Sequence, residues 1–274
     1  MNKLMLMLVL LVFGVSAQAD TARLQIIHNA ADPAAAVVDI YVNGDLLLDD
    51  FAFRAATPFQ DVPAGVTLNI GVAPSGSVSA DDALAVIPVT LESNKTYVAI
   101  ANGVLDPTMF ADNPDAREIG FALFANDRIR EKARWPWFTD IIAFHGASDA
   151  PTVDILRDAR WNRTLFDDLS YGEFSRYRTV ASREYVLDVT PGNDNNTVVA
   201  SFRADLSGLR GGSAVVFASG FLSPAANQNG PAFGLFAALA DGTVVGLPAI
   251  GQTARLQVIH NAADPAAEMV DVYV

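Results

Sequence analysis

The sequence predicts an all-β protein built from tandem β-sandwich domains of the immunoglobulin-like, Greek-key type. A motif at residues 24–44, LQIIHNAADPAAAVVDIYVNG, returns loosely at 141–156 as IIAFHGASDAPTVDIL and almost unchanged at 256–274. The runs that follow the first two copies are short, rich in branched residues and separated by turn residues, which is typical of a β-sandwich. The apolar residues nowhere follow the spacing of a convincing amphipathic helix.

The spacing of the motif predicts the domain organisation. The three histidines, His28, His145 and His260, occupy the same place in the three copies and lie 117 and 115 residues apart. This spacing has the length of a domain and is much longer than the period of a solenoid or propeller. We therefore expect a first sandwich over 20–138 (repeat one), a second over 139–252 (repeat two) and the start of a truncated third repeat over 253–274.

Residues 1–19 have the features of a secretory signal peptide. Lys3 supplies a positive charge, residues 4–15 form an apolar run that is short for a membrane span, and Ala17-Gln18-Ala19 is a small-x-small cleavage site. No later apolar stretch approaches eighteen residues. We therefore expect an exported protein, periplasmic, cell-surface or extracellular, with no transmembrane segment after cleavage.

Composition and charge limit the chemistry further. The chain has no cysteine, which excludes disulfides and thiolate metal sites. Its net charge of −13 at pH 7 argues against nucleic acid and anionic membranes as partners. The acidic excess is mostly aspartate, which suits the turns of a loop-rich β-protein, although a saline setting or calcium binding in loops would also explain it.

Repeat one is expected to contain seven or eight short strands. Asn43-Gly44 is a strong hairpin signal because both residues of the tight turn need positive φ. A second hairpin is expected across residues 92–95. The strand-like runs lie at 24–29, 37–42, 46–48, 67–73, 86–91, 96–102 and 119–125.

Repeat two carries the same landmarks in the same order, so whole domains were duplicated. Asp49-Asp50 of repeat one corresponds to Asp167-Asp168 of repeat two, and residues 97–107 correspond to 214–224. Adjacent carboxylates on a strand point to opposite faces, so these pairs are interpreted as turn residues and not as acid–base pairs.

The segment between the repeats, residues 127–139, is basic and contains Trp135 and Trp137. One interpretation is an aromatic platform that stacks on a sugar, with Trp161 as a further candidate. The other is a wedge packed between the domains, since tryptophan and arginine are enriched at packed surfaces. The segment enters the next repeat without a flexible linker, and this favours the wedge.

Each copy of the motif combines one histidine with two aspartates. Imidazole and carboxylate could bind zinc or, with backbone carbonyls, calcium, and His28, Asp32 and Asp39 are the metal candidates. One histidine per domain is few for zinc, and aspartate and histidine also stabilise turns through backbone hydrogen bonds. We therefore favour a structural role, and expect no cofactor, for His28, Asp32, Asp39, His145, Asp149, Asp154, His260, Asp264 and Asp271.

The motif resembles the bacterial domain-of-unknown-function family 4397, whose consensus reads approximately HASPDAPAVDVYVNG. Repeat one matches it at His28, Asp32, Pro33, Asp39, Tyr41, Asn43 and Gly44. Repeat two ends its motif differently, at residues 156–159, so its hairpin should turn differently. The resemblance implies an exported β-sandwich module, often in tandem, and implies no activity.

The function expected from these features is a non-catalytic secreted or surface module that binds a surface polymer or protein, or acts as a spacer. The alternatives are a carbohydrate-binding protein that uses Trp135 and Trp137, and a metal-dependent hydrolase that uses the His/Asp motif. The hydrolase is disfavoured because no nucleophile motif accompanies the histidines.

The last copy of the motif raises a separate question. Residues 253–274 are identical to 21–42 at 18 of 22 positions but are too few to bury a core. We expect a fragment of a longer protein whose remainder completes a third sandwich. The alternative is self-association through the C-terminal strand, which would join the sheet edge of a neighbouring copy.

Overall fold

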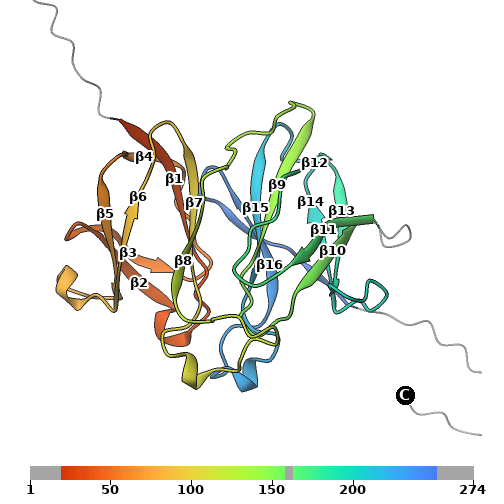
Figure 1. Cartoon of the computed structure of the whole chain (residues 1–274). Coiled ribbons are helices and arrows are strands. Elements are labelled where there is room, and N and C mark those ends of the chain that lie inside the picture. Colours follow the sequence, from red (N-terminus) through yellow and green to blue (C-terminus); the bar gives the residue numbers. More distant parts are fainter. Residues whose placement is uncertain (1–19, 158–162, 252–274) are drawn as a thin grey trace, which may run out of the picture.

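The computed structural model describes residues 20–157 and 163–251, and these form tandem all-β sandwiches, as predicted (Figure 1). No helix within these ranges is long and apolar enough to cross a membrane. The expected signal peptide, Trp161 and the third motif with His260, Asp264 and Asp271 lie outside the described residues.

Repeat one consists of two facing four-stranded sheets. The first has the order β4-β1-β7-β8, with β1 (Thr21–His28), β4 (Gln60–Pro63), β7 (Thr96–Asn102) and β8 (Ala122–Asn126). The second has the order β3-β2-β5-β6, with β2 (Val37–Val42), β3 (Asp45–Ala52), β5 (Thr67–Pro74) and β6 (Ala85–Thr90). Short 3-10 helices are η1 (Pro33–Ala35), η2 (Ala80–Asp82) and η3 (Pro107–Met109). The sequence pattern missed β4, which is short and ends in a proline.

Repeat two has the same plan with five strands in each sheet. One sheet has the order β12-β9-β15-β16-β17, with β9 (Phe138–His145), β12 (Arg178–Ala181), β15 (Ser213–Ser219), β16 (Gly234–Leu239) and β17 (Val244–Gly246). The other has the order β11-β10-β13-β14-β18, with β10 (Val153–Arg157), β11 (Arg163–Leu169), β13 (Glu184–Pro191), β14 (Ala200–Asp205) and β18 (Ala249–Ile250). The 3-10 helix η5 spans Pro224–Ala226. In both repeats the motif strand pairs in parallel with a later one, β1 with β7 and β9 with β15.

Each sandwich has its own core, and two further apolar clusters join the sandwiches, the larger of which we call the joint core. Alternate side chains of β1, such as Leu24 and Ile26, enter the core of repeat one, whereas Ile27 points to repeat two. The joint core contains Ile27, Val98 and Ile100 together with their counterparts in repeat two, Phe144, Val215 and Phe217. The central sheets are thus buried on both faces, which explains why the motif begins as a nearly continuous apolar run (Figure 1).

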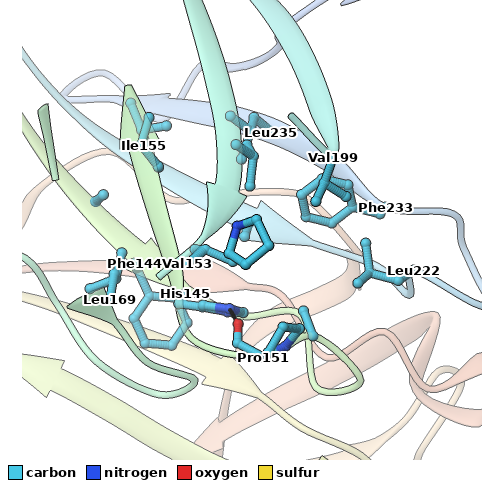
Figure 2. Close-up of a pocket in the computed structure, with 16 residues that line it drawn as sticks. Phe144, His145, Pro151, Val153, Ile155, Leu169, Val199, Leu222, Phe233 and Leu235 are labelled. Atoms are coloured by element: carbon cyan, nitrogen blue, oxygen red, sulfur yellow. Dashed lines mark hydrogen bonds between the residues drawn. The ribbon is translucent and has the colours of Figure 1, made fainter. Parts of the chain in front are cut away.

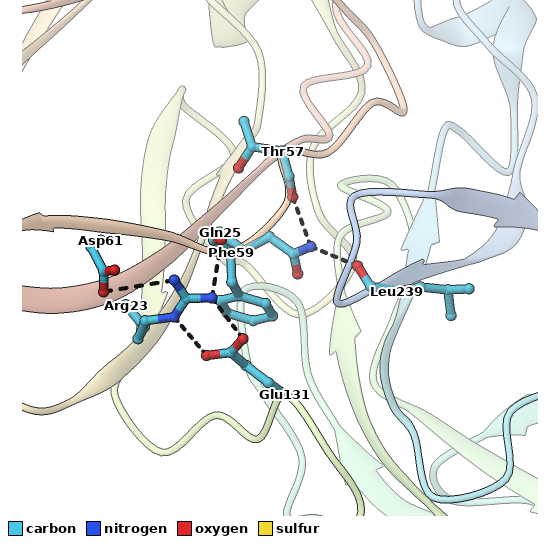
Figure 3. Close-up of polar contacts among 7 residues, drawn as sticks. All are labelled: Arg23, Gln25, Thr57, Phe59, Asp61, Glu131 and Leu239. Carbon is cyan, nitrogen blue, oxygen red and sulfur yellow. Dashed lines mark hydrogen bonds and ion pairs between the residues drawn. The ribbon is translucent and has the colours of Figure 1, made fainter.

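Polar contacts fix the relative position of the sandwiches (Figure 3). Gln25 donates from Nε2 to the carbonyl of Thr57 at 2.9 Å and to that of Leu239 in repeat two at 2.8 Å. The guanidinium of Arg23 donates two hydrogen bonds of 2.8 Å to the carboxylate of Glu131, which ties β1 to the connecting segment. Such bidentate pairs constrain direction as well as distance.

Arg54 crosses the same interface. Its guanidinium carbon lies 4.7 Å from the ring centroid of Phe53 and 4.1 Å from that of Phe236. The guanidinium N–H groups donate hydrogen bonds to the Ser219 hydroxyl and the Ala232 carbonyl. Burial lowers the pKa of Arg54 to about 10, so the side chain remains charged at neutral pH. A cation between two aromatic faces adds attraction to the apolar contact.

The prediction that tryptophans form the interdomain wedge is wrong. Trp135 and Trp137 are 56% and 64% exposed, whereas Ile129 of the same segment is buried in the joint core. The interface is made mainly by side chains of the central sheets and of neighbouring loops, such as Phe110 and Phe221, and not by the tryptophans. Composition could not distinguish the two cases, because tryptophan is enriched both at packed surfaces and at ligand-binding ones.

Candidate functional site

His28 ends β1 and is 1% exposed. Its Nε2 lies 2.7 Å from the carbonyl oxygen of Ala35, so Nε2 carries the proton and donates it. Nδ1 accepts a long hydrogen bond of 3.4 Å from the amide of Ala30. Burial lowers the pKa of His28 below its ordinary value of 6.5, and the imidazole is neutral at pH 7.

The first aspartate of the motif ties loops together in both repeats. Asp32 caps η1 through the amide of Ala34 and accepts a second hydrogen bond, of 2.8 Å, from the amide of Leu105. Asp149 accepts from the amides of Leu222 and Ser223, both at 2.8 Å. Leu105 and Leu222 are equivalent, so the motif loop is joined to the same loop each time.

The second aspartate holds a bulge between two strands. Asp39 is buried and accepts hydrogen bonds from the amide of Asp50 at 2.9 Å and from the amide and hydroxyl of Ser77. These hydrogen bonds lower the pKa of Asp39. Asp154 accepts from the amide of Asp168 at 2.7 Å in repeat two. Asp50 and Asp168 both have positive φ, 52° and 48°, where the strand pairing shifts register.

The bulge corrects the expectation that Asp49 and Asp50 point to opposite faces. Oxygens of Asp39, Asp49 and Asp50 lie within 4.8 Å of one another. Within residues 20–157 and 163–251, no other three carboxylate or histidine side chains lie close enough together to bind one metal ion. His28 and Asp32 do not belong to it. An all-oxygen set suits calcium better than zinc, but both oxygens of Asp39 already accept protein hydrogen bonds.

His145 occupies the place of His28 but has different surroundings. Its Nε2 lies 3.0 Å from the carbonyl oxygen of Pro151, and the side chain is 1% exposed. Nδ1 has no hydrogen-bond partner among the described residues. His145 also lines an apolar cavity that the sequence did not predict (Figure 2). The signal was present in the aligned repeats, because Ala143 and Leu169 replace the larger Ile26 and Phe51.

An exposed aromatic patch lies apart from the motifs. We call Trp135, Trp137 and Phe138, with Arg134 and Arg210, the tryptophan patch. The guanidinium carbon of Arg210 lies 4.6 Å from the ring centroid of Trp137, and that of Arg134 lies 6.0 Å from Trp135. Phe138 is 40% exposed. The patch therefore combines apolar faces with charged hydrogen-bond donors.

The two-sandwich plan and the paired motifs agree with a comparison to known families. The family described as domain of unknown function (DUF4397) matches residues 22–123 and, in a second copy, 139–273. The chain belongs to this family. The resemblance inferred from the motifs is thus confirmed for both DUF4397 repeats. A search of the curated proteins finds no match.

Proposed function

We propose that this DUF4397 protein is an exported, non-catalytic module that binds a surface polysaccharide through the tryptophan patch. The observation that carries the proposal is the exposure of Trp135 and Trp137, 56% and 64%, on a short segment anchored at both sides. Ile129 is buried in the joint core before the patch, and β9 begins at Phe138. An exposed aromatic pair of this kind is costly to leave in water and is typical of a contact surface.

The chemistry of the patch suits a sugar. Indole faces pack against the apolar C–H faces of a pyranose ring, and arginine donates hydrogen bonds to hydroxyl groups. Arg210 lies over one face of Trp137 and brings its guanidinium donors next to the ring. The net charge of −13 repels nucleic acid, which argues against it as a partner.

In this proposal the His/Asp motif has no catalytic role. His28 donates to a backbone carbonyl, and Asp32 and Asp39 accept backbone amides. These hydrogen bonds hold the loops in place, which supports the structural interpretation over the hydrolase alternative. The exported location rests on the signal-like features of residues 1–19.

A glycan array probed with the whole protein tests the proposal. Wild type should bind a set of glycans, and the double variant Trp135→Ala/Trp137→Ala should lose that binding with an unchanged melting temperature. Val78→Ala is the matched control, because Val78 is an apolar side chain, 92% exposed, in repeat one. Retention of binding by the double variant, or no bound glycan for wild type, would show that the patch has another role.

A further inference from the structure

We infer that repeat two binds a small apolar molecule with one hydrogen-bond donor, in the cavity between its sheets beside His145. The ligand class is a hydroxyl-bearing aromatic or branched aliphatic compound. This site is separate from the tryptophan patch and does not rest on the function proposed for it.

The cavity is apolar and built into the core of repeat two. Its volume is about 40 Å³, against roughly 10–15 Å³ needed for one water. Its walls come from both sheets (Figure 2), and the lining side chains include Val153, Leu169, Val189, Val216, Phe233 and Leu235. A void lined in this way is poorly suited to water, which needs polar partners, and well suited to a hydrocarbon group.

Repeat one has larger side chains at two of the positions that line the cavity in repeat two. The positions of Ala143 and Leu169 are taken by Ile26 and Phe51, which are buried in the core of repeat one. The ring centroid of Phe51 lies 5.9 Å from that of His28, in the space next to the imidazole. Exchange of Phe51 for leucine and of Ile26 for alanine removes several buried carbons, and the surrounding strands do not collapse fully into the space.

His145 is the single polar side chain among the residues that line the cavity. With Nε2 donating to Pro151, Nδ1 is left as an acceptor, and no described residue donates to it. A buried acceptor without a donor is costly, so a ligand that brings a hydroxyl gains more here than its apolar analogue does. Burial lowers the pKa of His145, which keeps the imidazole in the neutral, accepting form at pH 7.

The cavity is accessible from the surface. Val199 and Leu222 line it and are 49% and 38% exposed. Figure 2 shows them beside Phe233, away from Leu169 and Phe144. A ligand can place a small apolar end in the cavity and extend past these side chains, so its size is not limited to the enclosed volume.

Titration with phenol, followed by methyl NMR on the whole protein, tests the inference. Phenol should shift the methyl signals of Val153, Leu169 and Leu235 saturably and leave those of the repeat-one core unchanged. Toluene, which has the same shape without the donor, should bind at least tenfold more weakly. The ¹⁵N signal of Nδ1 should move with phenol and not with toluene.

Variants that restore the repeat-one residues serve as controls. Ala143→Ile or Leu169→Phe should abolish the phenol shifts, and Trp137→Ala should not change them. The reverse pair Ile26→Ala/Phe51→Leu should create phenol binding in repeat one, which keeps the test valid if a filled variant fails to fold. Absence of saturable shifts in wild type, or their persistence in a folded filled variant, would overturn the inference. Equal affinity for toluene would overturn the role of His145.

Discussion

At the scale of single residues, the motif histidines act as neutral, buried hydrogen-bond donors. His28 and His145 each donate to a carbonyl within the same loop, and burial lowers the pKa of both. Their protonation is therefore resisted in the folded state and not in the unfolded chain. The same two residues that look like a metal site in the sequence thus make stability depend on pH.

We expect the free energy of unfolding to fall as the pH drops from 7 to 5. In the unfolded chain the histidines take up protons around their ordinary pKa of 6.5, whereas the folded His28 and His145 take up protons only at lower pH. Protons therefore bind preferentially to the unfolded state in this pH range and favour it. Carboxylates with lowered pKa, such as Asp39, lose their contribution only below about pH 4. Urea unfolding at several pH values measures the slope, and His28→Gln/His145→Gln should flatten it. A flat profile in wild type would contradict this assignment.

Asp39→Asn should cost about 1–3 kcal/mol of unfolding free energy, because it weakens the acceptor that holds the bulge and Ser77. Asp49→Asn is the control, since Asp49 is exposed and belongs to the same carboxylate group. EDTA should leave the melting temperature unchanged. If calcium raises it in wild type and not in Asp49→Asn, the group binds a cation and the structural interpretation fails.

At the scale of elements, strands buried on both faces define the interface. Gly146, directly after β9, allows the strands of the two repeats to approach, because a Cβ there would collide with the Asn29 side chain and the Ala218 carbonyl. Asn29 donates to Asn102 and to that same carbonyl. A single methyl group at this position would push the Asn29 side chain away from its hydrogen-bond partners.

Gly146→Ala should therefore destabilise the protein by about 1–3 kcal/mol, in the range of overpacked cores. Gly208→Ala is the matched control, since a Cβ at Gly208 meets nothing within 4 Å. Its effect should stay within about 0.5 kcal/mol. Equal effects of the two substitutions, measured by chemical denaturation, would show that close approach at Gly146 is unimportant.

The sequence predicted most elements because strand alternation and turn residues are local signals. Asn43-Gly44 with positive φ at both residues agrees with the expected hairpin. The bulge at Asp50 was not predictable, since it depends on a hydrogen bond that the Asp50 amide donates to the Asp39 carboxylate on the neighbouring strand. The cavity depends on which side chains of distant strands meet, and periodicity carries no information about that.

At the scale of the whole molecule, the joint core holds the two sandwiches against each other. Phe144→Ala should cost about 3–5 kcal/mol and loosen the pair, because the ring is fully buried between the repeats. Small-angle scattering should then report a longer and more variable particle. Trp135→Ala and Trp137→Ala should leave the scattering profile unchanged, since both side chains are exposed. If the tryptophan variants lengthened the particle and Phe144→Ala did not, the tryptophans would be the interdomain wedge after all.

The joint core has a further consequence, because it is nearly symmetric. Ile27, Val98 and Ile100 meet Phe144, Val215 and Phe217, which are the same positions 117 residues later. Equal patches that face each other are the mark of a twofold homodimer, so the pair has the geometry of two identical subunits fused into one chain. Each of the two described repeats has one such patch, and each patch is buried by the other. The apolar faces of the two central sheets therefore leave neither repeat with an exposed patch at these positions.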